Sequence, residues 1–173
     1  MHLSKFNHYT HDVIFVDGLW GTGKSILTPI ISGMKGVEKA KANYVYEYTC
    51  ILNHLGEMET AATAAFLQMY ADIDQYHNLI GREVNLRWGD DSGFANNPNV
   101  LRYLWRMFGA EGDAVIDRID RENIALNIMS HLILPVAKPL CEAFGNRLKI
   151  IEIVRHPLYM FSHWEAYLSR FLG

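Results

Sequence analysis

The chain has 173 residues, half of them hydrophobic and a fifth charged, which is typical of a soluble globular protein and excludes a disordered segment. Its net charge of -3 argues against a general binder of nucleic acid or of acidic membranes, because such proteins carry a basic surplus. Cys50 and Cys141 match no metal-binding or redox spacing, which favours a reduced, cytoplasmic setting. We expect residues 1–173 to form a single domain with no nucleic-acid partner.

The N-terminal stretch "MHLSKFNHYTHD" is polar and lacks the apolar core of a signal peptide. We therefore expect His2, His8 and His11 to lie in a mobile, solvated terminus rather than to bind a metal. No segment of the sequence approaches 18 uninterrupted apolar residues, so we expect no membrane segment in this chain.

The first half of the chain begins with a β-branched and aromatic run, Val13 to Asp17, that predicts a buried strand ended by a glycine turn. A helix follows from Ser25 to Gly33, in which Pro29 is tolerated only near the first turn. The stretch "NYVYEYTCIL", Asn43 to Leu52, is a candidate second strand, although the same residues also fit the start of a helix. Glu57 to Leu79 has helical spacing and is ended by Gly81.

The second half begins with "RWGDDSGFANNP", a loop that suits either a substrate loop or an inert connector. Leu148 to Val154 is almost continuously apolar and predicts a central parallel strand covered on both faces. An aromatic helix from Pro157 to Leu172 finishes the chain. The helices expected between the loop and the strand are Val100 to Phe108, Asp120 to Ser130, and Pro135 to Phe144.

Alternating strands and helices of this kind predict an α/β fold, a three-layer P-loop NTPase-like architecture with a parallel sheet flanked by helices. In such sheets ligands bind beyond the carboxyl ends of the strands. Gly18 to Ser25 and Arg155 to Ser162 both begin where a predicted strand ends. We therefore expect the two segments to share one rim of the sheet.

The segment "GLWGTGKS" that follows the first strand satisfies the P-loop pattern in full. Its glycines allow backbone N–H groups to converge on a phosphate, and the helix that follows adds its positive N-terminal end. A lysine supplies a mobile cation, and the next hydroxyl a ligand for an oxygen or for Mg²⁺. The predicted phosphate-binding residues are Gly18, Gly21, Thr22, Gly23, Lys24 and Ser25.

Arg155 closes the last predicted strand, with Ser162 and His163 in the following helix. A guanidinium fixed at a strand end suits bidentate phosphate recognition, and a nearby hydroxyl completes the clamp. A solvent-exposed arginine at a strand end is the plainer interpretation of Arg155 when it is taken alone.

The run Met129 to Tyr167, with "SHLILP", "KIIEIVR" and "RHP" in that order, resembles the sulfotransferase superfamily. The resemblance covers the P-loop and this C-terminal run. It implies an enzyme that transfers a sulfuryl group from 3′-phosphoadenosine 5′-phosphosulfate (PAPS) to an acceptor hydroxyl or amine. It further implies that His131 is the catalytic base and that Arg155 and Ser162 bind the 3′-phosphate. Gly21 to Ser25 then hold the 5′-phosphosulfate end, where Lys24 neutralises the leaving phosphate.

The sequence departs from that family in two places. Ser162 stands seven residues after Arg155, and His163 occupies the place, one residue later, where the family usually has its serine. The family tends to carry a basic residue where this chain has Leu19 and Trp20, while Lys24 stands as in a nucleotide kinase. The chain also stops at Gly173, where family members continue, so a C-terminally truncated domain with an incomplete site stays open.

The alternative is a P-loop kinase or other NTPase that binds ATP and Mg²⁺ through Lys24 and Ser25, with Asp17, Asp117 or Asp120 as base or metal partner. A non-catalytic nucleotide-binding protein is a third possibility. In each case the partner is a nucleotide, and in both enzyme interpretations an acceptor that the sequence does not identify.

Overall fold

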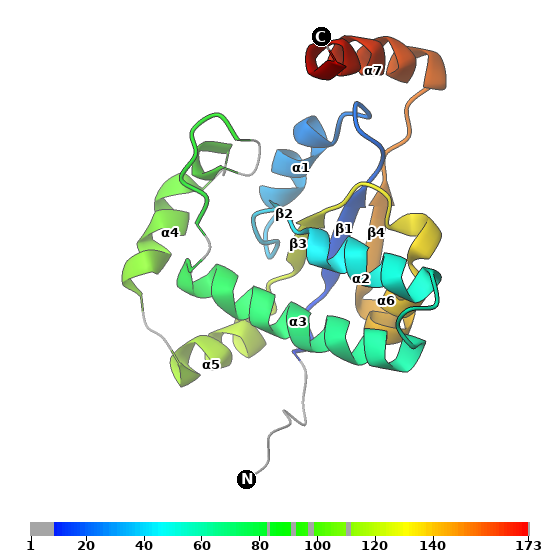
Figure 1. The fold of residues 1–173 in the computed structure, drawn as a ribbon. Coiled ribbons are helices and arrows are strands. Elements are labelled where there is room, and N and C mark those ends of the chain that lie inside the picture. Colours follow the sequence, from blue (N-terminus) through cyan, green and yellow to red (C-terminus); the bar gives the residue numbers. More distant parts are fainter. Residues whose placement is uncertain (1–8, 83, 91–92, 97–98, 110–111, 173) are drawn as a thin grey trace.

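Four parallel strands form one sheet in the order β2-β3-β1-β4, with helices on both faces (Figure 1). The structure is a computed structural model that describes residues 9–82, 84–90, 93–96, 99–109 and 112–172. The expected α/β class, with a parallel sheet between helices, is confirmed. The strands are β1 (Val13–Asp17), β2 (Lys41–Ala42), β3 (Leu126–Met129) and β4 (Leu148–Glu152).

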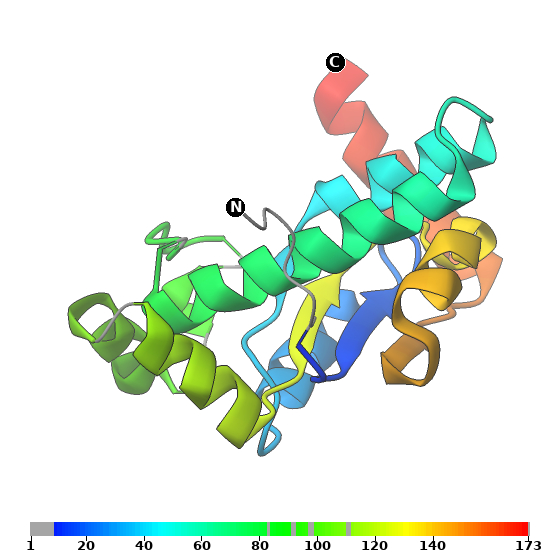
Figure 2. The same ribbon diagram turned by 90° about the horizontal axis from the view of Figure 1, so that it is seen from below.

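Helix α1 (Lys24–Ser32) covers one face of the sheet, while α2 (Tyr44–His54), α3 (Thr60–Ile80) and α6 (Lys138–Phe144) cover the other (Figures 1 and 2). Helices α4 and α5 lie to one side of the sheet, and α7 lies beyond the carboxyl ends of the strands. The remaining elements are α4 (Val100–Trp105), α5 (Asp113–Glu122), α7 (Pro157–Leu172), and the short 3-10 helices η1 (Phe94–Asn96), η2 (Arg106–Phe108), η3 (Leu134–Val136) and η4 (Gly145–Arg147).

The two faces of the sheet follow from the two-residue alternation of the strands. Val13 and Phe15 of β1 are fully buried in the main core with residues of α2, α3 and α6. Asn127 of β3 faces the opposite way, and its amide donates to the Ser32 hydroxyl of α1 at 3.3 Å. Burying one large apolar side chain such as Phe15 stabilises the fold by about 1.5–3 kcal/mol.

Tyr44 to His54 form a helix, so the candidate strand at Asn43 to Leu52 is wrong. The side chain of Asn43 caps the helix by accepting from the Val45 N–H at 3.2 Å. Tyr46 and Cys50, one helical turn apart, are both fully buried. The aromatic and β-branched residues that resembled a strand therefore place one apolar face on α3, with which α2 packs.

The predicted helix from Asp120 to Ser130 is also wrong, because α5 ends at Glu122 and β3 begins at Leu126. Asn123 adopts a left-handed conformation with φ 43°, which ends the helix. Leu126 then pairs with Val13 of β1 in parallel register.

Strand β4 ends at Glu152 and lies at the edge of the sheet, so the expectation of a central strand covered on both faces is wrong. It pairs with β1 alone, from Val13 opposite Leu148 to Asp17 opposite Glu152. Every residue of β4 is partly or fully exposed, and Ile151 keeps 37% of its surface exposed. Leu148 and Ile150 of its apolar run pack against the main core, and α6 packs on the strand.

Two smaller expectations also change. His11 is buried, at 1% exposure, and Tyr9 nearby is held by a hydrogen bond from its N–H to Asp72. His2 and His8 lie outside the described residues. Pro29 lies in the interior of α1 rather than at its first turn. It has no N–H to offer the carbonyl four residues earlier, so α1 forgoes one hydrogen bond and continues.

Other expected elements are confirmed. They include the strand Val13 to Asp17, the first helix after the P-loop, and the long helix ended by Gly81 in a left-handed conformation. The helix expected at Val100 to Phe108 appears as α4 continued by η2, and that at Pro135 to Phe144 as η3 and α6. The loop Arg87 to Pro98 contains η1, and its residues 91, 92, 97 and 98 lie outside the described ones.

The strand order reverses its direction at β1. From β1 the chain passes to β2 and β3 on one side, and it later reaches β4 on the other side. In open α/β sheets this reversal is where ligands bind, outside the carboxyl ends of the strands. Over the described part of the chain, no helix has both the length and the apolar run that crossing a bilayer requires.

Candidate functional site

The loop between β1 and α1 has the backbone that a phosphate cradle requires. Gly18, Gly21 and Gly23 have φ values of 137°, 85° and 108°, which side chains other than glycine rarely tolerate. Thr22 closes the turn inside the loop, since its hydroxyl donates to the Leu19 carbonyl at 2.8 Å. Lys24 begins α1, so the loop ends at a helix N-terminus with N–H groups that have no partner within the helix.

The loop is also confined by its neighbours on the β4 side. A Cβ atom on Gly18 would lie 2.5 Å from the carbonyl oxygen of Ile153, just beyond β4. A Cβ on Gly21 would lie 2.7 Å from the ring of His163 on α7. Glycine at Gly18 is therefore required by a backbone contact as well as by conformation, whereas the contact at Gly21 is with an exposed side chain that can shift.

Lys24 is buried at the centre of the rim. Its ammonium donates to the carbonyl of Gly18 and, at 2.6 Å, to the carbonyl of Ser130 at the end of β3. Desolvation lowers the pKa of Lys24, whereas the charges of Asp17, Glu47 and Glu152 act in the opposite direction. The amine therefore bridges the loop and β3 through two of its three N–H groups.

Asp17, the last residue of β1, is 1% exposed and fully engaged. One carboxylate oxygen accepts from the Ser130 hydroxyl at 2.8 Å, and the other accepts from the N–H groups of Ile133 and Leu134, both at 2.9 Å. Asp17 thus fixes the turn after β3, which carries His131. Its carboxylate acts on the rim through this turn.

Glu152 at the end of β4 lies beside Asp17. Desolvation, the charge of Asp17 and a side-chain hydrogen bond with Asp17 raise the pKa of Glu152, while Lys24 opposes that shift. Two carboxyls and one ammonium therefore meet where β1 and β4 end. Asp117 and Asp120, the other acids considered from the sequence, lie on α5, which packs against α3, so the structure does not bring them to the rim.

Glu47 of α2 holds His131 in place. One of its oxygens accepts from the backbone N–H of His131 and, at 3.4 Å, from that of Leu132. The same oxygen lies 3.5 Å from Nδ1 of the His131 ring, an ion-pair distance without hydrogen-bond geometry. Burial raises the pKa of Glu47, but the nearby His131 side chain and the backbone N–H groups of His131 and Leu132 outweigh it and leave the pKa below its ordinary value.

Two aromatic rings contact the ring of His131. Its ring stacks on Tyr44 of α2 with centroids 5.5 Å apart and planes 11° apart. Trp20 of the P-loop meets it edge-on at 5.9 Å. Trp20 and Tyr44 remain 64% and 47% exposed, so the histidine is held between rings that face solvent.

Arg155 and α7 reach the P-loop from the β4 side. The Arg155 guanidinium donates to the Gly21 carbonyl at 3.0 Å, which confirms that the two segments share one rim. Trp164 of α7 donates its indole N–H to the Trp20 carbonyl at 2.8 Å. Ser162 donates to the carbonyl of Tyr159 within α7, so it contacts its own helix, and His163 takes the place against the loop.

Among the residues predicted from the sequence, Gly18, Gly21, Gly23, Lys24, His131 and Arg155 come together, and Ser25 lies exposed in the first turn of α1 beside them. Sequence reasoning missed Glu47, because its segment was interpreted as a strand. Helical spacing offers a signal, since Glu47 is the only acid in the first turn of α2 and lies next to the buried Tyr46.

Comparisons of the chain with protein-family models, with curated proteins and with solved structures find no match. Within the described ranges, no three His, Cys, Asp or Glu side chains gather as a group that could hold a metal ion. Cys50 is buried and Cys141 exposed, and both are free thiols.

Proposed function

We propose that the chain has a P-loop NTPase-like fold and is a sulfotransferase-like enzyme that transfers a sulfuryl group from PAPS to an acceptor hydroxyl or amine. One observation carries the proposal: three separate segments meet at the carboxyl end of β1. Lys24 donates to the carbonyl of Ser130, directly before His131, and Arg155 donates to the P-loop carbonyl of Gly21. Anion-binding groups and a candidate base therefore lie on one rim.

The residues of the rim fit a phosphate or sulfate group by their chemistry. The N-terminus of α1 and the glycine-rich backbone before it offer N–H donors to an anion. Lys24 and Arg155 add two cations, one compact and one planar. PAPS supplies an activated sulfuryl group whose leaving group is a phosphate.

In the proposed reaction, His131 takes the proton from the acceptor. The Glu47 carboxylate faces Nδ1 of His131, so it favours a proton on that nitrogen and leaves Nε2 to accept one. Lys24, released from its two carbonyls, stabilises the charge that develops on the leaving phosphate. Arg155 holds the nucleotide at its 3′-phosphate, which orients the reacting atoms.

Thermal unfolding with two ligands tests the proposal. Adenosine 3′,5′-bisphosphate without Mg²⁺ should stabilise the protein, by about 2.7 kcal/mol at a hundredfold excess over Kd. ATP with Mg²⁺ should stabilise it less. Arg155→Ala should erase most of the preference, because a charge-assisted bidentate contact is lost. Arg121→Ala, at an exposed position on α5, is the matched control and should leave the preference unchanged.

A second candidate, a P-loop kinase or other NTPase with ATP and Mg²⁺, is favoured by the carboxyl pair of Asp17 and Glu152 next to Lys24. Carboxylates at this place suit a hard cation that bridges nucleotide phosphates. A larger, Mg²⁺-dependent stabilisation by ATP that survives Arg155→Ala would support the kinase. No stabilisation by either nucleotide would overturn both candidates.

A further inference from the structure

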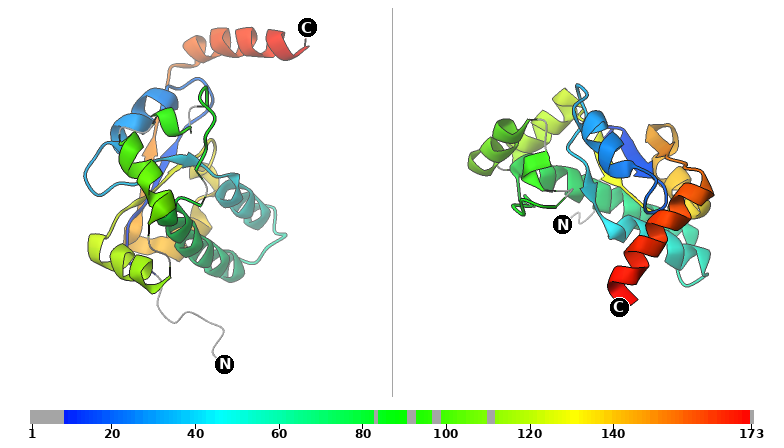
Figure 3. Two further views of the ribbon diagram at one scale, coloured as in Figure 1. Left: turned by 90° about the vertical axis from the view of Figure 1, so that its left-hand side faces the viewer. Right: turned by 90° about the horizontal axis from the view of Figure 1, so that it is seen from above.

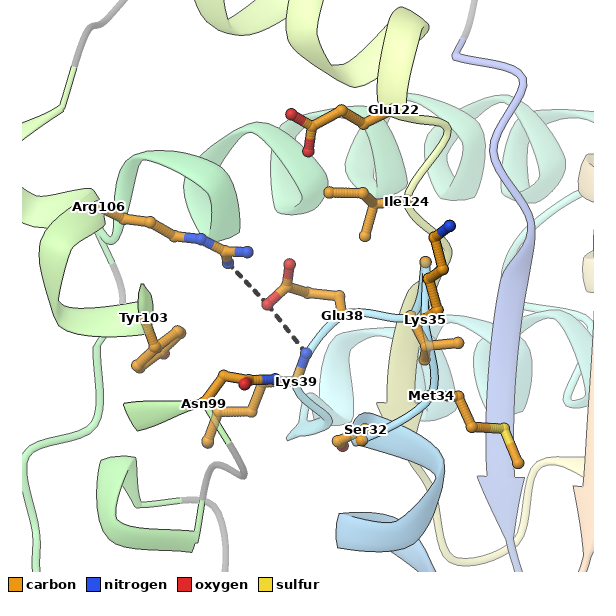
Figure 4. A pocket seen from close by; sticks show the side chains of 13 residues that line it. Ser32, Met34, Lys35, Glu38, Lys39, Asn99, Tyr103, Arg106, Glu122 and Ile124 are labelled. Atoms are coloured by element: carbon orange, nitrogen blue, oxygen red, sulfur yellow. Dashed lines mark hydrogen bonds and ion pairs between the residues drawn. The ribbon is translucent and has the colours of Figure 1, made fainter. Parts of the chain in front are cut away.

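A second polar cavity lies beside the sheet, away from the carboxyl ends of the strands (Figure 4). Its volume is about 430 Å³, within the range of small-molecule sites. The turn that follows α1 forms one wall, and α4 with η2 forms the wall opposite. Ile124, which precedes β3, and Glu122, which ends α5, close it. We call it the Glu38–Arg106 cavity after the ion pair inside it.

The ion pair between Glu38 and Arg106 is buried. Nη1 of Arg106 lies 2.7 Å from Oε1 of Glu38, and the two side chains are 10% and 3% exposed. The same carboxylate oxygen also accepts the backbone N–H of Lys39 at 2.9 Å. Nη1 of Arg106 donates further to the carbonyl of Asn78, at 3.3 Å. One edge of each charged group is therefore engaged.

The Glu38 carboxylate and the Arg106 guanidinium each have a further polar atom that makes no hydrogen bond among the described residues. Among the described residues, neither Oε2 of Glu38 nor Nε of Arg106 has a hydrogen-bond partner, although both atoms are buried. Figure 4 shows the carboxylate and the guanidinium directed toward one another within the cavity. Leaving a buried polar atom of a charged group without a partner is unfavourable. Two residues that line the cavity therefore carry one acceptor and one donor whose hydrogen bonds are unmade among the described residues.

The charges around the ion pair define the occupant further. The lining holds three cations, Lys35, Lys39 and Arg106, and two carboxylates, Glu38 and Glu122, and Glu122 is also paired with Arg118 of α5, so positive charge is in excess around the cavity. The amine of Lys39 lies 5.6 Å above the ring of Tyr103. Burial is the main reason that the pKa of Lys39 falls to about 8, against the attraction of Glu38 and Asp90. An anionic group on the occupant would offset that burial cost.

We propose that the Glu38–Arg106 cavity binds a small carboxylic acid that carries a hydrogen-bond donor next to its carboxylate, a 2-amino or 2-hydroxy acid. The donor pairs with Oε2 of Glu38, and the carboxylate accepts from Nε of Arg106 and neutralises the excess positive charge. A ligand with only one of these groups leaves the other buried atom unpaired.

This site is independent of the P-loop rim. The turn that lines the cavity bonds near the amino end of β3, where Glu38 N–H donates to the Ala125 carbonyl at 2.9 Å, whereas the P-loop lies at the carboxyl ends. The two sites share α1, which begins in the P-loop and ends at the cavity wall.

Titration calorimetry of the full chain with aspartate, malate and succinate tests the proposal, since the three diacids differ only in the amino, hydroxyl or hydrogen substituent at C2. Aspartate or malate should bind at least about tenfold more tightly than succinate, because succinate lacks the donor for Glu38. Binding of aspartate alone identifies an amino acid, and binding of malate alone a hydroxy acid. Equal binding of all three, or no binding at millimolar concentration, overturns the proposal.

Variants locate the binding. Glu38→Gln preserves the shape of the side chain and should weaken the preferred diacid about tenfold, with little effect on succinate. Since this variant disturbs a buried ion pair, Lys35→Ala at the exposed rim gives a second measure and should weaken both diacids. Lys138→Ala, an exposed lysine on α6, is the control and should change neither. Diacid binding that is unchanged in both Glu38→Gln and Lys35→Ala would place the ligand elsewhere and overturn the proposal.

Discussion

At the scale of single residues, the ionisable side chains of the rim are held by main-chain groups. Lys24 donates to the Ser130 carbonyl, Asp17 accepts from two N–H groups of the turn after β3, and Glu47 accepts from two more. Such hydrogen bonds offset the cost of removing a charge from water. The turn that carries His131 is therefore fixed by charges from β1 and α2, before any ligand binds.

Replacement of Glu47 by Gln should destabilise the protein by about 1 kcal/mol at neutral pH, because a charged acceptor of two backbone N–H groups becomes a neutral one. The pKa of Glu47 is below its ordinary value of 4.5 in the folded chain. Its contribution to stability is therefore complete above pH 4.5 and is lost as the pH falls through the lower pKa of the folded state. Urea unfolding of both proteins across this range measures the difference.

The stability difference between wild type and Glu47→Gln should thus shrink toward acid pH. A difference that is the same at neutral and acid pH would contradict the role of the ionised carboxylate. Glu57→Gln, at an exposed position after α2, is the control and should unfold like the wild type at every pH.

Lys39 should also make stability rise with pH, but in the alkaline range, and here the wild type rather than the variant is the less stable protein at neutral pH. Its pKa is about 8 in the folded chain, against 10.5 for the ordinary side chain. Between these values the unfolded chain binds a proton that the folded chain has lost, so stability rises with pH. Lys39→Met, which has no ammonium to desolvate, should be more stable than the wild type near neutral pH and should lose that advantage as the pH approaches 10.5. A constant difference in urea unfolding between about pH 7 and about pH 10 would be inconsistent with this account.

The sequence predicted those rim residues that stand at a recognisable distance from the end of a predicted strand. Lys24 and its glycines follow a strand at fixed positions, and Arg155 stands just beyond the end of another. The pairing of Glu47 with His131 could not be predicted, because the two residues are 84 positions apart and only the packing of α2 brings them together. Ser162 was expected from its place in the helix after Arg155 as well as from the resemblance, but the structure directs its hydroxyl to its own helix.

At the scale of elements, the errors of prediction concern segments whose structure depends on contacts distant in the sequence. Strand β4 was expected at the centre of the sheet, but it pairs with β1 alone. The residues of α2 are rich in β-branched and aromatic side chains, whose preference for strands is weak and depends on packing. In α2, the Asn43 cap and the face buried against α3 stabilise a helix instead of a strand. Strand β3 was missed because it has only four residues and its register is set by β1, a partner far away in sequence.

The contact between the P-loop and the end of β4 predicts a large effect of Gly18→Ala. The added Cβ would lie 2.5 Å from the backbone oxygen of Ile153, in addition to the strain of φ 137°. Gly56→Ala is a matched control, since Gly56 has φ 79° and open space around it. We expect the control to lose about 1–2 kcal/mol from its conformation and Gly18→Ala to lose clearly more. Equal losses of unfolding free energy in chemical denaturation would show that the contact with Ile153 does not affect stability.

At the scale of the whole molecule, the helices are not equally bound to the sheet. Helix α3 packs on α2, α5 and α6, with Leu67 and Ala71 almost fully buried. Helix α7 instead extends across the carboxyl ends of the strands (Figure 3). Much of its apolar surface is exposed, and Met160 is its buried apolar contact within the described side chains. Local stability should therefore fall from α3 to α7.

Hydrogen exchange measured by mass spectrometry should show this gradient, with amides of α7 exchanging well before those of α3. Trp164→Phe keeps the ring but removes the N–H that donates to the Trp20 carbonyl, so α7 should exchange about fivefold faster still while α3 is unchanged. Glu165→Gln, at an exposed position on the same helix, is the control and should leave exchange of α7 nearly as in the wild type. Protection of α7 equal to that of α3 would contradict the gradient.

Because α7 follows Arg155, which contacts the P-loop, adenosine 3′,5′-bisphosphate should slow hydrogen exchange in α7 if the proposed 3′-phosphate contact forms. Arg155→Ala should abolish that slowing.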